Sequence, residues 1–196
     1  MKTNFIKIFI LSVFLVFTAC SSDGGDGAEC QTIACQNGGV FENCECLCPE
    51  GFSGTDCSSQ ITPTKIKVTK IRVKYFPNTN NGSNWDVGGL PDIFVRLGKG
   101  NGDNNTQLLY TSNVIENAVS NGVTVFDFVP TTATYITSVT QQHVVILGDY
   151  DTASYNDFMG GFTFTPYNNT NRFPASILLQ DASVPLSFEL FLTYEF

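Results

Sequence analysis

Five aspartates fall in two short clusters of this sequence, and their spacing indicates metal binding. Asp86 and Asp92 belong to the segment DVGGLPD, and Asp149, Asp151 and Asp157 belong to the segment GDYDTASYNDFMGG. Each cluster lies between apolar, β-branched runs, where the end loops of a β-sandwich are expected. Carboxylates that converge from two loops repel one another by roughly 1 kcal/mol per pair in water and by about 4 kcal/mol in a partly buried site. Hard oxygen donors with no nearby His or Cys therefore favour a bound Ca²⁺.

The elements that must position these aspartates are β-strands. Residues 64–196 contain runs rich in Val, Ile, Thr, Phe and Tyr, separated by Asn, Gly and Asp clusters. The apolar alternation from Ile71 to Tyr75 slips its phase at Thr69 and Lys70, which predicts a β-bulge. We predict an all-β fold, an eight-stranded antiparallel β-sandwich. Its expected strands are Ile66–Phe76, Ile93–Gly98, Gln107–Ser112, Val123–Phe128, Val144–Gly148, Gly161–Thr165, Ala175–Leu179 and Leu186–Phe196.

The first nineteen residues have the pattern of a signal peptide. Two lysines precede an apolar stretch over residues 8–17, and Thr18 and Ala19 come directly before Cys20. The stretch is shorter than the roughly 20 apolar residues of a membrane-spanning helix. Small residues followed at once by a cysteine resemble the lipobox of bacterial lipoproteins, which implies cleavage before Cys20 and acylation of its thiol. An ordinary secretory signal is the alternative.

Cysteine usage supports an exported, lipid-anchored chain. Of the seven cysteines, six lie within residues 30–57 and Cys20 stands apart. An odd cysteine in an exported chain needs an explanation, which lipidation supplies. The six clustered cysteines predict disulfides in an oxidising compartment, and zinc is the less favoured alternative there.

Residues 20–29 contain no large apolar side chain and should form a flexible tether. The Ser- and Asp-rich run after Cys20 resembles the surface-export signal of Bacteroidetes lipoproteins. That resemblance implies a bacterial outer membrane lipoprotein exposed on the cell surface, with the periplasmic face still open. The full chain has 10 Lys and Arg against 18 Asp and Glu, a net charge of −8. This balance argues against nucleic acid as a partner and gives no general attraction to anionic membranes.

Residues 30–57 contain two turn-rich motifs, C-x-N-G-G from Cys35 and C-P-x-G-F-x-G-x-x-C from Cys48. Both resemble the signatures of an EGF-like domain, and residues 58–63 follow as a linker. The resemblance implies the disulfides Cys30–Cys44, Cys35–Cys46 and Cys48–Cys57, although spacing alone does not decide the pairing. Ala28 replaces the acidic or amide residue expected in calcium-binding members, so a spacer or protein-contact role is favoured for this module.

The two aspartate clusters, read as D-x-x-G-L-P-D-I-F-V-R-L and D-Y-D-T-A-S-Y-N-D-F-M-G, resemble the C2 domain, a calcium- and phospholipid-binding β-sandwich. The resemblance covers residues 64–196 and implies that all five aspartates are calcium ligands on loops one and three. It also implies the backbone carbonyls of Trp85 and Tyr150 as further ligands. The first strand already corresponds to the one that leads into loop one, which favours the permuted, type II strand order.

The residues around the aspartates leave the purpose of calcium open. We expect Trp85, Tyr150 and Tyr155 to pack at the loop bases, although such groups can also dip into a bilayer. Neither residues 78–90 nor the segment between Asp151 and Asp157 contains Lys or Arg. This absence disfavours anionic lipid, so calcium could instead rigidify the loops or bridge to a glycan or a protein.

Catalysis has little support in the sequence. His143, the single histidine, falls at the start of an expected strand, where a structural role is favoured. No Ser/His/Asp or Cys/His set can be assembled, so we expect no enzyme. The functional hypothesis is a surface-anchored lipoprotein whose C2-like domain attaches to lipid, glycan or protein when Ca²⁺ is bound. The alternative is a calcium-stabilised display module without a calcium-dependent ligand.

Overall fold

The fold is taken from a computed structural model that describes residues 30–86, 89–103, 106–152 and 155–196. The signal segment, Cys20 and the tether lie outside the described residues, so the expectations about them stay predictions. Within the described ranges, no helix is long and apolar enough to cross a membrane. The described secondary structure consists of strands, which agrees with the predicted all-β class.

The cysteine-rich segment forms two small antiparallel hairpins held by disulfides. Cys35 is bonded to Cys46 and Cys48 to Cys57, which are two of the three expected pairs. Cys30 and Cys44 are disulfide-bonded as well. The hairpin strands are β1 (Val40–Glu42) with β2 (Glu45–Leu47), and β3 (Phe52–Ser53) with β4 (Ser59–Gln60).

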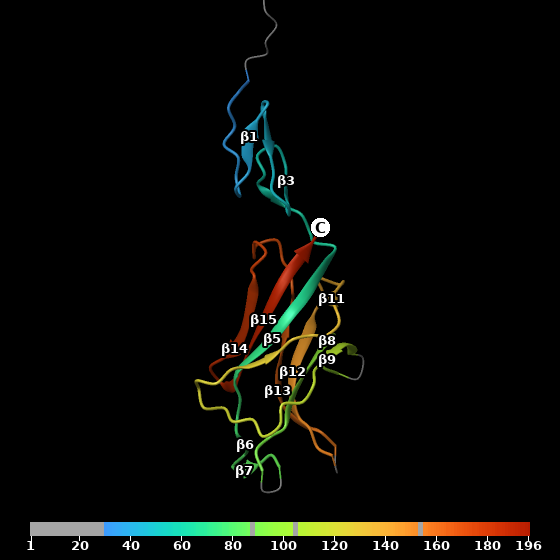
Figure 1. Cartoon of the computed structure of the whole chain (residues 1–196). Helices are drawn as coiled ribbons and strands as arrows, with labels where there is room; N and C mark the ends of the chain where they lie inside the picture. Colours follow the sequence, from blue (N-terminus) through green and yellow to red (C-terminus); the bar gives the residue numbers. More distant parts are fainter. Residues whose placement is uncertain (1–29, 87–88, 104–105, 153–154) are drawn as a thin grey trace, which may run out of the picture. The chain divides into compact units, whose positions relative to one another are not determined.

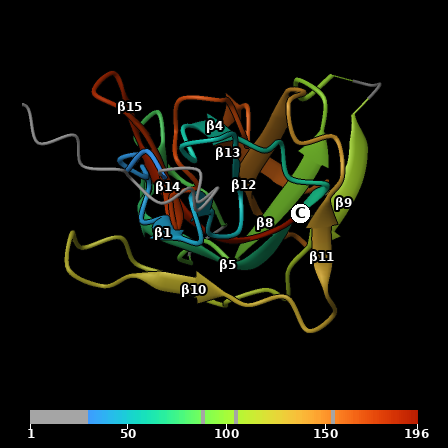
Figure 2. The ribbon, with the colours of Figure 1, turned by 90° about the horizontal axis from the view of Figure 1, so that it is seen from above.

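The larger part of the chain folds into two antiparallel sheets that face each other (Figure 1; Figure 2). The first sheet has the order β10-β5-β15-β14, and β11 also pairs with β5. The second sheet has the order β13-β12-β8-β9. Their bounds are β5 Lys65–Tyr75, β8 Ile93–Lys99, β9 Gln107–Thr111, β10 Phe126–Phe128, β11 Thr134–Ile136, β12 His143–Asp149, β13 Asp157–Phe164, β14 Ser176–Asp181 and β15 Val184–Glu195.

All eight expected strands of the sandwich occur, with shifted ends. β11 is additional, and it continues the edge that β10 forms, because both strands pair with successive parts of β5. The bulge predicted near Thr69 is confirmed, since Phe191 pairs with Lys70 and Leu192 with Val68. The last strand of the sandwich, β15, pairs with the first, β5.

Strand β13 begins at Asp157, four residues before the expected start. The reason is a bulge: Leu147 pairs with Gly160 and Gly148 with Phe158, so Met159 is the extra residue. This insertion breaks the alternation that would have identified the strand. Asp157 is therefore a strand residue rather than a loop residue.

The core lies between the inward faces of the two sheets, where strand alternation buries every second side chain. Side chains of β5 such as Ile71 and Val73 face those of β8 and β12 such as Val95 and Leu147, and all four are fully buried. Because the interior is filled by aliphatic and aromatic side chains, binding must use the end loops or the outer faces.

Candidate metal-binding end of the sandwich

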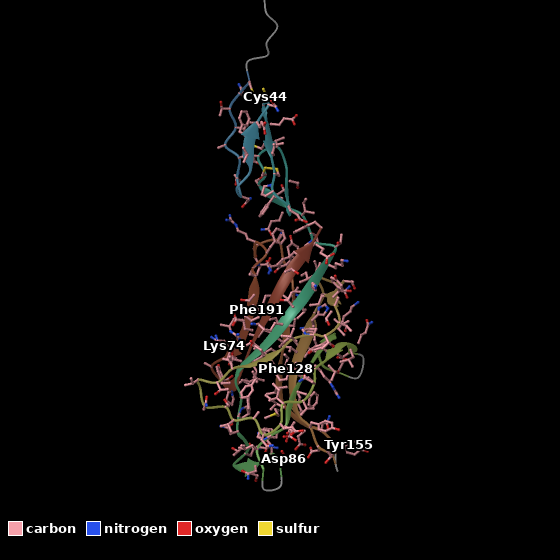
Figure 3. The ribbon with its side chains drawn as sticks, in the orientation of Figure 1. Cys44, Lys74, Asp86, Phe128, Tyr155 and Phe191 are labelled. Carbon is pink, nitrogen blue, oxygen red and sulfur yellow. A yellow bond between two sulfur atoms is a disulfide. The ribbon has the colours of Figure 1, made fainter. Side chains whose placement is uncertain are left out.

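Three of the five aspartates lie on neighbouring strands at one end of the second sheet. Asp92 directly precedes β8, Asp149 ends β12, and Asp157 begins β13. β12 lies between the other two strands, and Asp149 is the register partner of both Ile93 and Asp157. The antiparallel pairing therefore brings these three carboxylates to the same edge. Figure 3 shows Asp86 and Tyr155 at this end as well.

Asp149 occupies an inward-facing position of β12 and is completely buried. Its Oδ1 accepts a hydrogen bond of 2.6 Å from the backbone N–H of Asp92, which joins the two clusters. Its Oδ2 is buried and has no hydrogen-bond partner in the described structure. A buried carboxylate oxygen without a partner costs free energy unless a cation or a proton compensates it. Asp149 is thus the strongest single indication of a bound cation.

The carboxylates act on one another's protonation. Burial, together with the negative charges of Asp86, Asp151 and Asp92, raises the pKa of Asp149 to about 6, although the hydrogen bond from the Asp92 N–H acts in the opposite direction. The pKa of Asp86 is also raised, first by burial and then by the charges of Asp92, Asp151 and Asp157. All five aspartates therefore share one negative field, which a divalent cation would relieve.

A segment that sequence reasoning missed holds the aspartates in place. The backbone N–H of Asn117 donates to Oδ1 of Asp92 at 2.8 Å, and the N–H of Ala118 donates to the Pro91 carbonyl at 2.8 Å. Asn117 has a φ of 52°, a conformation that asparagine adopts more readily than most residues. The sequence signal was only this isolated asparagine, because the segment has no strand or helix periodicity.

The base of loop one is fixed by side chains as well. Asn78 and Ser120 exchange two hydrogen bonds of 2.7 and 2.8 Å between side chain and backbone. Trp85 packs against the core and its Nε1–H donates to the Pro77 carbonyl at 2.8 Å, as expected of a residue at a loop base. Beyond this base the loop forms the small hairpin of β6 (Thr79–Asn80) and β7 (Ser83–Asn84), and Trp85 separates this hairpin from Asp86.

The expectation that Tyr155 packs at a loop base is wrong, because this side chain is 96% exposed. The N–H of Asp151 donates to Oδ1 of Asn156 at 3.2 Å, and this bond closes the loop at its base. Tyr155 lies inside the closed segment and contacts none of the core residues. Tyr150 is 40% exposed, and its N–H donates to the Asp92 carbonyl at 2.8 Å.

The described side chains do not complete a metal site. Among them, no three His, Cys, Asp or Glu side chains lie close enough together to hold a metal ion. Residues 87–88 and 153–154, which lie within the two aspartate loops, are outside the described part of the chain. The donor chemistry fits Ca²⁺, because it consists of carboxylates, one of them buried with an unpartnered oxygen. The carbonyls of Trp85 and Tyr150 stay predictions.

His143 has the structural role that the sequence favoured. It begins β12, at the opposite end of that strand from Asp149, and is 1% exposed. Its Nδ1 lies 2.9 Å from the Gln141 carbonyl oxygen, and burial lowers the pKa of the imidazole. The histidine therefore lies apart from the aspartates, and the expectation that the chain is not an enzyme stays a prediction.

Comparisons with known proteins give structural neighbours only. No family model and no curated protein matches the chain. A solved structure described as "Structure of a C2 domain" has 12% sequence identity and a TM-score of 0.46, with 67% of this chain and 98% of that chain covered. "BON1-C2B" has 11% identity and a TM-score of 0.45, with coverages of 73% and 100%. The paired C2 domains of Extended-Synaptotagmin 2, described as calcium bound, have 18% identity and a TM-score of 0.42, with coverages of 68% and 46%. With all three TM-scores below 0.5, the likeness carries no argument about the site.

Proposed function

We propose that the chain is a lipoprotein, anchored through Cys20, whose β-sandwich binds Ca²⁺ at its aspartate end. The observation that carries the calcium proposal is Asp149, a buried carboxylate with an unpartnered oxygen among four further aspartates. A divalent cation there would compensate the unpaired oxygen and the mutual repulsion at once. The odd cysteine after an apolar leader carries the anchoring proposal.

The five aspartates would contribute to the calcium site in two ways. Asp149, Asp92 and Asp157 would hold the ion from strand ends, and Asp86 and Asp151 would bring the two loops to it. When bound, calcium supplies positive charge and open coordination positions that an oxygen ligand of a partner can fill. Such a partner would be a lipid, a glycan or a protein. The exposed Tyr155 lies where it could contact this partner.

A structural role for calcium is the second candidate, and the strand positions favour it. Asp149 and Asp157 belong to adjacent strands and Asp92 directly precedes the third, so an ion held by them would connect the ends of three strands of the second sheet. No Lys or Arg occurs in loop one or between Asp151 and Asp157, which removes the usual attraction to an anionic surface. In this case calcium would stabilise the sandwich, and a face other than the aspartate end would be the one displayed for contact.

For a lipid ligand, co-sedimentation with vesicles distinguishes calcium-dependent attachment from a structural role of calcium. The Cys20→Ala variant is used, so that an acyl chain does not itself insert. It is mixed with vesicles of phosphatidylcholine, with and without phosphatidylserine, in millimolar Ca²⁺ or in chelator. Calcium-dependent sedimentation supports the attachment function. Binding that is equal in calcium and chelator contradicts calcium-dependent lipid attachment, and a calcium-induced rise in thermal stability without sedimentation favours the structural role.

A further inference from the structure

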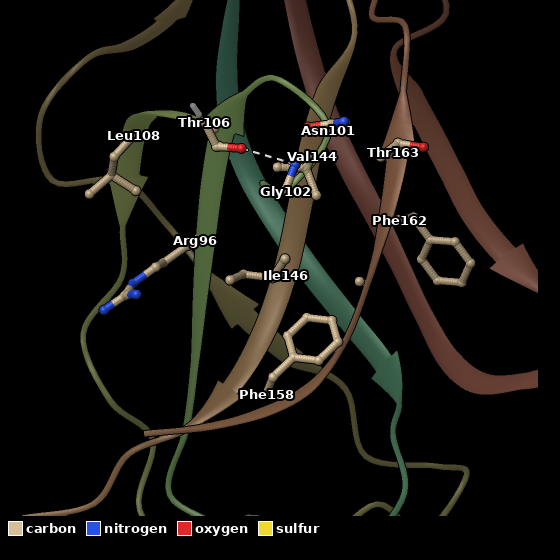
Figure 4. A pocket seen from close by; sticks show the side chains of 12 residues that line it. Arg96, Asn101, Gly102, Thr106, Leu108, Val144, Ile146, Phe158, Phe162 and Thr163 are labelled. Atoms are coloured by element: carbon tan, nitrogen blue, oxygen red, sulfur yellow. Dashed lines mark hydrogen bonds between the residues drawn. The ribbon is translucent and has the colours of Figure 1, made fainter. Parts of the chain in front are cut away.

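The outer face of the second sheet carries a groove that the aspartate end does not explain. It is lined mainly by Arg96, Leu108, Val144, Ile146, Phe158 and Gly161, and we call it the outer groove. Its volume of about 420 Å³ falls in the range of small-molecule sites. Figure 4 shows Ile146 in the middle, with Phe158 on the β13 side and Arg96 extending toward β9.

The strand register explains why this face is hollowed. Val144 is flanked by Thr163 and Gly98, and Ile146 is flanked by Gly161 and Arg96. Two of these outward positions are therefore glycines, which leave space beside Ile146, while Val144 lines the groove at only 7% exposure. The packing requires them: a Cβ on Gly98 would lie 2.5 Å from Cγ2 of Thr106, and one on Gly161 would lie 2.7 Å from the Val145 carbonyl oxygen.

The rims of the outer groove are exposed apolar side chains on the two edge strands. Phe158 on β13 is 66% exposed and Leu108 on β9 is 58% exposed. Two polar oxygens of the lining are already engaged, since Oγ1 of Thr106 accepts from the Gly102 N–H at 2.9 Å and Oδ1 of Asn101 accepts from the Asp103 N–H at 3.2 Å. The groove therefore fits a ligand with an apolar body and few hydroxyl groups of its own. This requirement disfavours a glycan.

Arg96 supplies the charge of the outer groove. The described structure gives its guanidinium no salt bridge and no hydrogen bond, and its recorded contact is with the ring of Phe94, 5.1 Å from the centroid. By contrast, Arg72 on the other sheet is paired with Asp127 at 2.7 Å. An unpaired guanidinium presents a planar fork of donors that matches a carboxylate.

We propose that the outer groove binds an amphipathic monocarboxylate, with its carboxylate on Arg96 and its aliphatic body over Ile146 and Val144 against Phe158. The aliphatic floor favours an acyl chain. The four strands of the sheet span about 14 Å, which suits a short or medium chain lying across them. The proposal goes beyond the proposed calcium function and does not depend on it, because none of these contacts involves an aspartate of the metal-binding end.

The test uses isothermal titration of the full chain with decanoate in chelator, with methyl decanoate as the uncharged comparison. Decanoate should bind the unchanged protein more tightly than methyl decanoate does. Arg96→Gln should weaken decanoate by about tenfold, the effect of losing a charge-assisted contact, and leave methyl decanoate unchanged. Phe158→Ser should weaken both compounds, because it removes a rim of the apolar surface.

Two matched variants serve as controls. Lys74→Gln removes a cation from the other sheet, and Val123→Ser removes an 86% exposed apolar side chain elsewhere. Neither should change decanoate binding. The proposal is overturned if the unchanged protein fails to bind decanoate, or if the controls weaken binding as much as Arg96→Gln and Phe158→Ser do. It is also overturned if the face proves to be a self-contact, shown by Phe158-dependent dimerisation in sedimentation together with no decanoate binding.

Discussion

Position 149 carries a carboxylate where the alternation of β12 places inward-facing, apolar side chains. Its neighbours in that alternation, Val145 and Leu147, are fully buried. An aspartate at such a position costs stability unless a partner compensates its charge. The hydrogen bond from Asp92 compensates one oxygen and leaves the other without a partner. At the scale of the residue, the aspartate end is thus poised for a cation.

Asp149→Asn should increase the stability of the protein in chelator at pH 7.5, by about 1–2 kcal/mol. The amide removes the buried charge, and its oxygen can still accept the hydrogen bond from Asp92. Urea unfolding measures the change. Asp181→Asn is the control, because Oδ1 of Asp181 accepts a turn hydrogen bond from Ser183 that an amide oxygen can keep. A clear loss of stability in the Asp149 variant would show that the carboxylate is already well compensated without metal.

Stability in chelator should also depend on pH through Asp149. The pKa of this group is raised by folding from 3.8 to about 6, so the folded state binds the proton more tightly than the unfolded state does. The stabilisation of the folded state by this tighter proton binding is fully present below pH 3.8 and is lost as the pH rises through about 6. His143 acts in the opposite direction, because burial lowers its pKa and the unfolded state then binds more protons.

The difference in unfolding free energy between the unchanged protein and Asp149→Asn isolates the Asp149 contribution, since that of His143 cancels. As the pH rises from about 4 to about 7, the unfolding free energy of the unchanged protein should decrease relative to that of Asp149→Asn by roughly 3 kcal/mol. Calcium affinity should fall below about pH 6, because protons compete for the same oxygen. A difference that stays flat across this range would contradict the assigned environment of Asp149.

At the scale of the element, β10 is a three-residue edge strand attached to β5 by side chains as well as by backbone. Asp127 receives two hydrogen bonds from Arg72, at 2.7 and 2.9 Å, and one from Lys70 at 3.3 Å. The basic residues of β5 thus serve in part to hold this edge. Lys65 is paired with Glu195 on β15 in the same way, at 2.9 Å.

Asp127→Ala should lower the free energy of unfolding by about 0.5–1 kcal/mol at pH 7, because the ion pair is only partly shielded from water. The guanidinium of Arg72 holds the pKa of Asp127 below its usual value. The stabilisation by the Asp127 ion pair is therefore present at pH values above the pKa of Asp127 in the unfolded state. It is lost as the pH falls through the pKa of Asp127 in the folded state. The gap between variant and parent, followed by urea unfolding from pH 7 to pH 2.5, should close in acid. A gap that persists at low pH would contradict an electrostatic role.

The strands were predictable where alternation is unbroken, and the errors have specific physical causes. The bulge at Met159 hid the start of β13, and the short β11 has too few residues to show a period. The aspartates were found from their type and spacing. Their scaffold at Asn117 and Ser120 was missed, because it depends on hydrogen bonds between the backbone of one loop and side chains of a distant loop. The outer groove was missed because only the cross-strand register shows that its glycines lie beside Ile146 and Val144.

At the scale of the whole molecule, the proposal joins an anchor, a disulfide-stapled module and a calcium-binding sandwich in one chain. The anchor depends on Cys20, the one cysteine outside the cluster of six. Cys20→Ala should abolish incorporation of a labelled fatty acid into the chain expressed in a bacterial host. Cys57→Ala is the control, since it removes a disulfide-bonded cysteine and should leave labelling intact. Labelling that persists in the Cys20 variant would refute the anchor.

The most direct test of calcium binding is thermal unfolding of the protein in millimolar Ca²⁺ and in chelator, with Asp149→Asn/Asp151→Asn as the matched variant. Binding in the 10⁻⁴ to 10⁻³ M range expected of extracellular modules should raise the unfolding temperature by roughly a few degrees. The double variant should show no rise, and Mg²⁺ should have a smaller effect on the unchanged protein. An unfolding temperature that is the same in calcium and in chelator would contradict the calcium site.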